Sequence, residues 1–246
     1  MITSLENEKI KNIVKLHSKK YRDQFGLFLV EGEHLIQEAF GNGLLEEIIL
    51  LDGYDIDVDV PKTMVSELVM KKLASLDSIP NMIGVCHKKE ESNELGNHIL
   101  LLDEIQDPGN LGTIIRSAVA FNIDTIVLSL DTVDLYNSKV LRASQGMFAY
   151  INIIRRDSME IIQKIKELHI PVYGTNVIQG TDVRTIEAKE KFCLVMGNEG
   201  QGLKRKIQEL CDKNLYIPMN NKVESLNVGV ACSILLYELG GEHEKN

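Results

Sequence analysis

Three polar loops hold the residues whose types and spacing are best suited to chemistry. The first, DEIQDPGNLGTIIRSA, turns through residues 107–109 after a predicted strand and enters a helix that contains Arg116. Arg116 lies off the apolar stripe of that helix, so its side chain is free to face a ligand. A guanidinium forms two parallel, charge-assisted hydrogen bonds with a phosphate. An arginine at this place suits a phosphate-bearing ligand, but spacing alone favours the alternative of a surface arginine paired with a nearby acid.

The second loop is the glycine-rich segment LVMGNEGQGL, which directly follows a buried strand. Gly197, Gly200 and Gly202 would let backbone amides approach a ligand closely. Their spacing fits neither GxGxxG nor the GxxxxGK motif of a P-loop, so the loop predicts neither of these nucleotide sites. A tight turn explains the glycines equally well. Asn198 and Glu199 add polar side chains where the strand ends.

The third loop, IPMNNKVESLN, follows a short strand that ends at Pro218 and Met219 and leads into a helix near Ser225. Ser225 could simply be the N-cap of that helix. The helix continues as VGVACSILLYEL, which is small and apolar on nearly every side, so we expect it to be buried. Its N-terminus should therefore belong to an interior site or an interface.

The elements that must position these loops alternate between strand and helix. The predicted strands are apolar throughout, as expected for parallel strands that are covered on both faces. In the helix 111–121 the apolar residues recur at helical spacing, and Asn110 is well placed to cap it. The pattern predicts an open, mostly parallel sheet that binds ligands at the carboxyl ends of its strands. Strands are predicted at 98–105, 125–129, 150–154, 171–177, 192–197 and 215–219, and helices at 111–121, 139–145, 159–168, 203–211 and 226–239.

A smaller α/β domain is predicted before the polar segment KKEESNELGN, which is typical of a linker. The division that follows is an N-terminal domain at residues 1–90, a linker at 91–97 and a C-terminal domain at 98–246. In the N-terminal domain we expect strands at 27–32, 45–51 and 82–87, and helices at 7–18, 34–40 and 66–74.

Composition excludes several classes of protein. The 246 residues are 44% hydrophobic and 26% charged, which is typical of an ordinary folded protein. No apolar run approaches the roughly 20 residues that span a bilayer, and the first residues lack the apolar core of a secretory signal. We therefore expect a cytoplasmic protein with no membrane segment. The four cysteines form no CxxC pair and the six histidines no HxxxH pair, so no metal site is predicted.

One cluster of basic residues occurs in this chain, although its formal net charge is −9. Between residues 9 and 22 the sequence places six cations and no acid. Nucleic-acid binding depends on such a local patch rather than on total charge, although a solvated helix face is the alternative. The cluster consists of Lys9, Lys11, Lys15, Lys19, Lys20 and Arg22.

Taken together, the three loops resemble the three motifs of the SpoU branch of the SPOUT RNA methyltransferases. The first motif corresponds to residues 110–112 with Arg116, the second to residues 196–203, and the third to residues 217–219 followed by 225–228. The match spans residues 100–238. Residues 19–39 also resemble the substrate-binding domain of this family, which is similar to the ribosomal protein L30e fold.

The resemblance implies a parallel sheet with a deep trefoil knot, a homodimer whose active site draws on both subunits, and S-adenosylmethionine as methyl donor. The implied acceptor is a ribose 2′-hydroxyl of ribosomal RNA, with 23S rRNA expected. A sulfonium donor is already activated, so the protein mainly positions the reactants and needs no metal. The alternatives are a transfer-RNA substrate and a non-catalytic RNA-binding or ribosome-assembly protein of the same fold.

The resemblance also assigns roles to residues. Arg116 is the leading candidate to activate the hydroxyl together with an RNA phosphate. Since a guanidinium is effectively always protonated, it would alternatively organise the phosphate while another group takes the proton. Asn110, Glu199, Ser225 and Asn227 would hold the substrate and the loops, Gly197, Ile217, Met219 and Leu226 would contact S-adenosylmethionine, and Lys15, Lys19, Lys20 and Arg22 would bind RNA.

Overall fold

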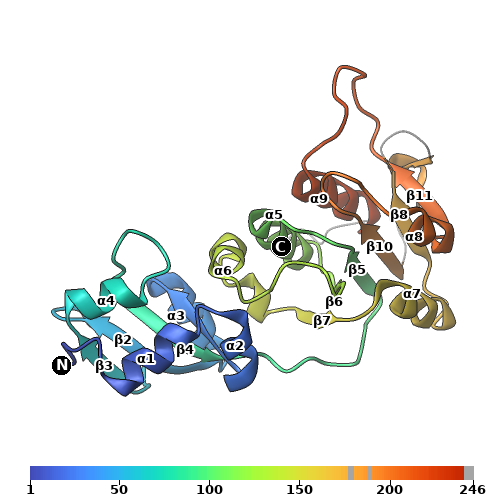
Figure 1. Ribbon diagram of the computed structural model, residues 1–246. Coiled ribbons are helices and arrows are strands. Elements are labelled where there is room, and N and C mark those ends of the chain that lie inside the picture. Colours follow the sequence, from blue (N-terminus) through green and yellow to red (C-terminus); the bar gives the residue numbers. More distant parts are fainter. Residues whose placement is uncertain (177–179, 188–189, 241–246) are drawn as a thin grey trace. The chain divides into compact units, whose positions relative to one another are not determined.

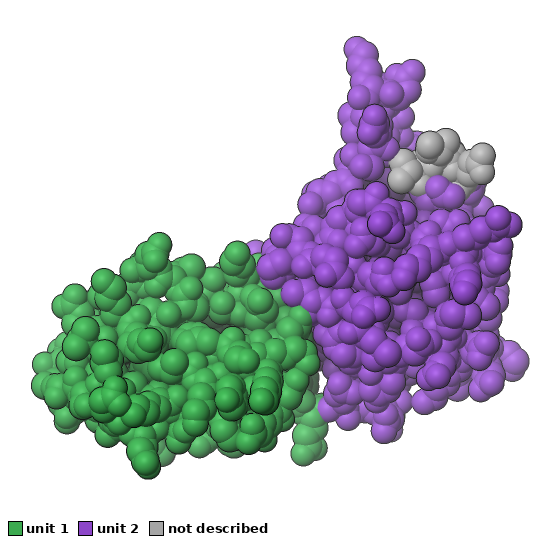
Figure 2. Space-filling model, viewed as in Figure 1, with its two compact units in different colours: residues 1–90, 134–150 green, residues 91–133, 151–246 purple. Residues whose placement is uncertain are grey.

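The computed structural model describes residues 1–176, 180–187 and 190–240. The chain forms two compact units, one of residues 1–90 and 134–150 and one of residues 91–133 and 151–246 (Figure 2). The end of the predicted strand 171–177 lies outside the described residues. Among the described residues, no helix combines the length and the apolar character that a bilayer crossing needs.

The first unit is built on a four-stranded sheet in the order β1-β4-β2-β3 (Figure 1). Strand β4 is antiparallel to both β1 and β2, whereas β3 is parallel to β2. The strands are β1 (Leu27–Glu31), β2 (Leu45–Leu51), β3 (Lys62–Val65) and β4 (Met82–His87). The helices are α1 (Glu8–Lys15), α2 (Lys19–Phe25), α3 (Glu33–Gly41), α4 (Glu67–Leu73) and α6 (Ser138–Ser144), with a 3-10 turn η1 (Met147–Ala149).

Helix α1 illustrates how capping and apolar spacing in the sequence determine the structure of this unit. Asn7 caps it, because its side-chain oxygen accepts hydrogen bonds from the backbone N–H groups of Lys9 and Ile10. Ile10 and Ile13 then recur at helical spacing and are buried in a cluster with residues of β2, β4 and α4. The prediction missed α2 and β3. Helix α2 has few apolar residues, and β3 is only 4 residues long.

Residues 134–150 group with the N-terminal residues, whereas the sequence division placed them in the C-terminal domain. Side-chain contacts explain the grouping. The Arg142 guanidinium donates to Ser75 Oγ at 2.8 Å, and the Tyr150 hydroxyl donates to Glu38 Oε2 at 2.6 Å. The boundaries of the functional domains stay predictions.

The second unit is built on a seven-stranded sheet in the order β7-β6-β5-β10-β8-β11-β9 (Figure 1). Every pair of neighbours is parallel, which confirms the predicted architecture. The strands are β5 (His98–Leu102), β6 (Thr125–Leu128), β7 (Asn152–Arg155), β8 (Val172–Thr175), β9 (Thr181–Asp182), β10 (Phe192–Met196) and β11 (Lys213–Tyr216). The helices are α5 (Pro108–Ala120), α7 (Ser158–Glu167), α8 (Arg205–Leu210) and α9 (Val228–Leu239), with a 3-10 turn η2 (Val183–Thr185).

The central strands of this sheet are apolar throughout because both faces are covered. Ile99 and Leu101 of β5 pack in one cluster with residues of α7 and α8. Leu100 and Leu102 alternate to the other face and are equally buried. Figure 1 shows α5 and α9, which pack against each other, on the side of the sheet away from α7 and α8. The parallel sheet and the smaller N-terminal α/β unit confirm the predicted fold class, whereas the trefoil knot stays a prediction.

Candidate active site

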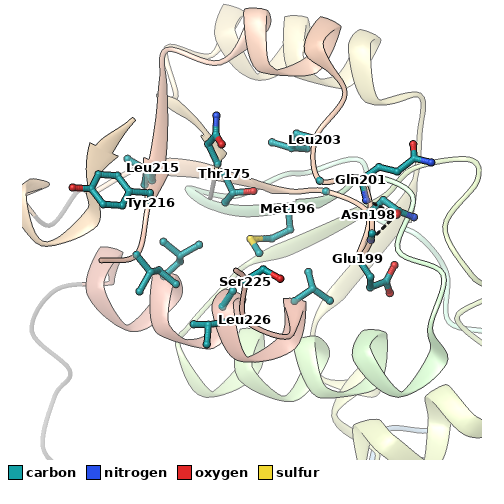
Figure 3. Close-up of a pocket in the computed structure, with 18 of the residues that line it drawn as sticks. Thr175, Met196, Asn198, Glu199, Gln201, Leu203, Leu215, Tyr216, Ser225 and Leu226 are labelled. Atoms are coloured by element: carbon teal, nitrogen blue, oxygen red, sulfur yellow. Dashed lines mark hydrogen bonds between the residues drawn. The ribbon is translucent and has the colours of Figure 1, made fainter. Parts of the chain in front are cut away.

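A cavity of about 270 Å³ opens at the carboxyl ends of β8, β10 and β11 (Figure 3). The carboxyl ends of parallel strands deliver their loops to one edge of a sheet, which is where such sheets bind ligands. The walls come from the end of β8, from the glycine-rich loop after β10, and from the third loop with the adjoining residues of β11 and α9. All four residues predicted to contact S-adenosylmethionine, namely Gly197, Ile217, Met219 and Leu226, line this cavity.

The two ends of the glycine-rich loop pack closely, with the backbone of Gly197 against that of Gly202 and Leu203. A Cβ atom there would lie 2.3 Å from the carbonyl carbon of Gly202, so only glycine fits. Asn198 closes the loop, because its Oδ1 accepts from Gly200 N at 2.9 Å and from Gln201 N at 3.2 Å. The loop is therefore held by its own hydrogen bonds and presents backbone to the cavity.

A chain of polar contacts joins the three motif loops. The Glu199 carboxylate accepts from Asn110 Nδ2 at 3.1 Å, and Asn110 Oδ1 accepts from Asn227 Nδ2 at 2.8 Å. Asn227 Oδ1 in turn accepts from Gly229 N at 2.9 Å at the start of α9. Residues about 90 and 120 positions apart in the chain thus form one constellation, as the three motifs predict.

Glu199 acts in this constellation as an ionised acceptor. Partial burial disfavours its charged form, but hydrogen bonds from the backbone N–H groups of Asp107 and Gln106 and from the Asn110 side chain outweigh burial and lower its pKa. The Asp107 N–H lies 3.0 Å from Oε1. A carboxylate with this many donors is suited to fixing loops rather than to taking a proton.

The prediction that Asn110 caps α5 is wrong, and the alternative in which Ser225 caps α9 does not hold either. Asp107 caps α5, since its Oδ1 accepts from Asn110 N at 2.8 Å and Pro108 takes the first helical position. Asn110 therefore lies in the first turn, where its side chain is free to bridge Glu199 and Asn227. Asn227 caps α9 in the same manner, and Ser225 is an exposed residue of the cavity wall.

Arg116 lies on the exposed side of α5, as its position off the apolar stripe predicts. It is not among the residues that line the cavity. Within the described part of the chain it has neither a hydrogen bond nor an ion pair, so the alternative of a surface pair with an acid gains no support. The Arg116 guanidinium is therefore available to a ligand that lies outside the cavity described above.

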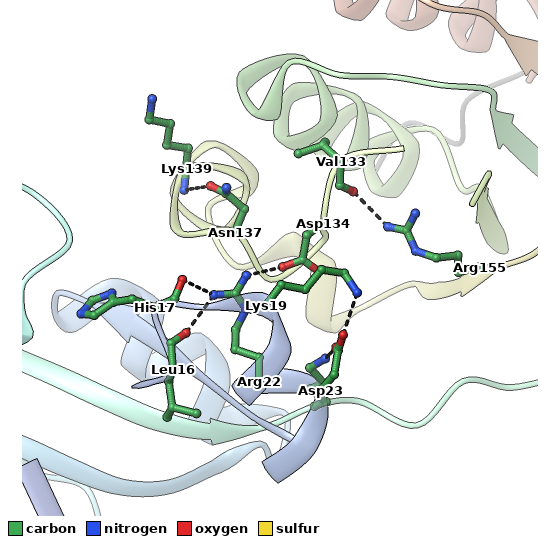
Figure 4. A network of polar contacts seen from close by, with 11 residues as sticks. Leu16, His17, Lys19, Arg22, Asp23, Val133, Asp134, Asn137, Lys139 and Arg155 are labelled. Carbon is green, nitrogen blue, oxygen red and sulfur yellow. Dashed lines mark hydrogen bonds and ion pairs between the residues drawn. The ribbon is translucent and has the colours of Figure 1, made fainter. Parts of the chain in front are cut away.

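The basic cluster of the first unit is smaller than the sequence predicts, because Arg22 points inward and Lys19 is paired with an acid (Figure 4). Arg22 is only 7% exposed and donates to Leu16 O at 2.8 Å, to His17 O at 2.9 Å and to Asp134 Oδ2 at 2.6 Å. Its assignment to RNA binding is therefore corrected: Arg22 holds this unit together. Lys19 pairs with Asp23 at 2.6 Å, which leaves Lys15 and Lys20 as exposed cations of the predicted set without an acid partner among the described residues.

Sequence reasoning missed Glu104, which anchors the glycine-rich loop from outside. Its backbone has a left-handed φ of 60°, its carbonyl accepts from Asn198 Nδ2 at 2.9 Å, and its carboxylate pairs with Lys204. The sequence offered no signal for this role, because the predicted strand 98–105 runs over Glu104, whereas β5 ends at Leu102. Thr175 and Tyr216 also line the cavity and were not predicted. Among the described residues, no group of three or more His, Cys, Asp or Glu side chains could hold a metal ion.

Comparison with known proteins agrees with this geometry. Residues 97–237 match the SpoU rRNA Methylase family, and residues 7–84 match the MRM3-like substrate binding domain. The chain is similar to the 23S rRNA (guanosine(2553)-2'-O)-methyltransferase RlmP of Bacillus subtilis (strain 168), with 39% identity over 245 residues that cover 98% of this chain and 99% of the relative.

Two solved structures are similar over nearly the whole chain. One is the AdoMet bound rRNA methyltransferase from Sinorhizobium meliloti, with a TM-score of 0.85 and 29% identity over 97% of this chain and 96% of that one. The other is an RNA 2'-O ribose methyltransferase, with a TM-score of 0.84 and 29% identity over 97% of both chains. With the family model matching more than half of its residues, the chain belongs to the SpoU rRNA methylase family.

Proposed function

We propose that this protein transfers the methyl group of S-adenosylmethionine to a ribose 2′-hydroxyl of 23S ribosomal RNA. The observation that carries the proposal is the joining of three motif loops, through Glu199, Asn110 and Asn227, beside a cavity at the carboxyl ends of parallel strands. Membership of the family, and a B. subtilis relative named for 2′-O-methylation of 23S rRNA, support the substrate and the reaction.

The cavity suits S-adenosylmethionine chemically. The glycine-rich loop offers backbone donors and acceptors, and Met196, Leu215 and Leu226 offer apolar contacts for the flat adenine base and the aliphatic carbons of the donor. Bound S-adenosylmethionine supplies an activated methyl group, so the residues of this chain mainly hold the reactants in line. A similar rRNA methyltransferase has been solved with AdoMet bound, which supports the same donor here.

Arg116 would act on the acceptor side of the reaction. It is exposed, lies outside the cavity lining and has a fork that matches a phosphate. Its role would be to hold the RNA phosphate next to the reacting ribose, while Ser225 and the Glu199–Asn110–Asn227 chain keep the cavity wall in place.

A homodimer is part of the proposal. Helix α9 leaves Val230 47% exposed and Tyr237 56% exposed, although its sequence is apolar on nearly every side. A second copy of the chain would cover this surface and would bring an Arg116 to the cavity of its partner. Light scattering at micromolar concentration should give twice the chain mass, and a monomer mass would contradict the proposed dimer.

An rRNA substrate would place the activity in the cytoplasm, which stays a prediction.

The direct test maps 2′-O-methyl groups in rRNA and tRNA from cells with and without this protein. We expect one 23S rRNA position to lose its methyl group without the protein and to regain it with the wild-type chain, but not with Arg116→Ala. A change confined to tRNA would replace the proposed substrate. Unchanged methylation in both RNAs would contradict the proposed reaction.

A further inference from the structure

Helix α2 carries an aromatic pair that the proposed chemistry does not use. Tyr21 and Phe25 are one helical turn apart, and their rings are 6.0 Å apart between centroids with an interplanar angle of 21°. Phe25 is 42% exposed. The stacked pair therefore leaves a large part of the Phe25 side chain exposed to solvent.

Two lysines flank the same pair. The ammonium groups of Lys15 and Lys20 lie 5.9 Å and 5.6 Å from the centroid of the Tyr21 ring. Both side chains are exposed, and neither forms an ion pair with another described residue. In a chain of net charge −9, this is a local site where positive charge and aromatic surface coincide.

The backbone of helix α2 beneath this aromatic pair is fixed by buried contacts. Arg22 lies between the two aromatic residues in sequence and points inward, with hydrogen bonds to Leu16 O and to Asp134 Oδ2 (Figure 4). Gly26 ends the helix with a left-handed φ of 68°, directly after Phe25. The aromatic face therefore does not depend on a loose loop for its orientation.

We propose that Tyr21 and Phe25 form a stacking platform for an unpaired base of the RNA substrate, with Lys15 and Lys20 contacting the flanking phosphates. The inference rests on the proposed function. Proteins bind single-stranded RNA by stacking bases on aromatic side chains beside positively charged groups. A base inside a duplex has no free face to offer, so the platform selects a loop, a bulge or a single-stranded segment. The lysines favour a polyanion over an apolar protein partner.

The test compares RNA binding by variants of the full-length protein. Phe25→Leu keeps an apolar side chain and removes the ring, and Phe40→Leu is the matched control, since Phe40 on α3 of the same unit is 43% exposed. The probes are a fluorescent single-stranded RNA of roughly 12 nucleotides, within the usual range of single-stranded site sizes, and a duplex of the same length. Melting temperatures check that each variant folds.

We expect Phe25→Leu to weaken single-stranded RNA binding by about 5- to 150-fold, the range for loss of one stacked base, and to leave duplex binding and the salt dependence unchanged. Lys15→Met with Lys20→Met should instead lower the slope of log K against log salt by about 0.7 for each lost phosphate contact. Phe40→Leu should bind both RNAs as the wild type does.

Two results would overturn the platform: single-stranded binding by Phe25→Leu within about twofold of wild type, or an equal loss for single-stranded and duplex RNA, since about 1 kcal/mol is the smallest effect of a stacked base. Methylation of 23S rRNA by the wild-type protein is measured in parallel. If the wild type methylates rRNA while Phe25→Leu binds RNA normally, the platform fails and the proposed function stands. If Phe25→Leu loses single-stranded binding while the wild type methylates no rRNA, the function fails and the platform stands.

Discussion

The motif loops of the second unit and helix α2 of the first both gather polar side chains, but they use them in opposite ways. In the loops, Glu199, Asn110 and Asn227 are bonded to one another and to backbone groups. On α2, Arg22 turns inward to hold the fold, whereas Lys20 faces solvent. Groups that share partners are energetically coupled, and separate surface groups are nearly additive. We therefore expect large, coupled effects from the loops and small, additive effects from α2.

The largest effect is expected at Arg116. Arg116→Ala should leave folding and S-adenosylmethionine affinity nearly normal, because the side chain is exposed and outside the cavity lining. Single turnover at saturating RNA should fall at least about a hundredfold, the low end for loss of a charge-stabilising or proton-transfer group. Arg116→Lys should rescue little, since an ammonium cannot reproduce the fork. Arg205→Ala is the control, because Arg205 is an exposed arginine paired on its own helix with Glu209. Near-normal turnover by Arg116→Ala would remove this residue from the reaction.

The glycine-rich loop should show the next largest effect. Gly197→Ala places a Cβ 2.3 Å from a backbone carbon of Gly202, so the loop must move. A displacement of about 1 Å in a positioned site can cost 10²-fold, and we expect S-adenosylmethionine affinity to fall by at least about tenfold in calorimetry. Gly200→Ala is the matched control, since its nearest neighbour would be Asn198 Oδ1 at 3.7 Å. If both variants bind S-adenosylmethionine with the affinity of the wild type, the loop is not part of the donor site.

Glu199→Gln should lower the melting temperature at pH 7 by roughly 2–4 °C, the shift for about 1 kcal/mol in a chain of this size. The pKa of Glu199 is lower in the folded protein than its usual value, so its charge stabilises the fold above the unfolded pKa, and this stabilisation is lost as pH falls through the folded pKa. The difference between the variant and the wild type should therefore shrink on acidification below about pH 4, near the ordinary glutamate pKa. A difference that grows on acidification would contradict an ionised Glu199.

The smallest effect separates two neighbouring lysines on α2. Lys20→Met should lower the salt slope of RNA binding by about 0.7, because an unpaired ammonium releases a counterion when it contacts a phosphate. Lys19 is already paired with Asp23 at 2.6 Å, so Lys19→Met should change the slope less. Identical slopes for both variants would show that the ion pair does not distinguish these two residues in the RNA complex.

The sequence predicted which loops lie together better than it predicted the direction of single side chains, and the reason is physical. Loops that follow parallel strands must meet at one edge of the sheet, and the resemblance of the three motifs to those of the SpoU family implied that Asn110, Glu199 and Asn227 hold the loops there. The direction of each side chain was not predictable in this way. Asn110 was expected to cap α5, but Asp107 takes that place and frees Asn110 to bridge the other two loops.

The same limit explains Arg22 and Glu104. A run of cations in the sequence does not show which members face inward, and the inward role of Arg22 depends on Asp134, which is 112 positions away. Glu104 anchors Asn198 through its backbone carbonyl and Lys204 through its side chain. Neither pairing leaves a trace in residue spacing, whereas the buried strands on which both depend are plain in the sequence.

The most direct test of the proposed function is methylation of unmodified 23S rRNA by the purified protein with isotopically labelled S-adenosylmethionine, followed by mass spectrometry of the nucleosides. We expect the label to appear in a 2′-O-methylribose at one position. Asn227→Ala should reduce its incorporation because it removes the hydrogen bond to Asn110, and Glu199→Gln should reduce it because it removes the charge and one of the acceptor oxygens that hold the first loop. Label on a base, or no incorporation by a wild-type protein that binds both S-adenosylmethionine and the RNA, would contradict it.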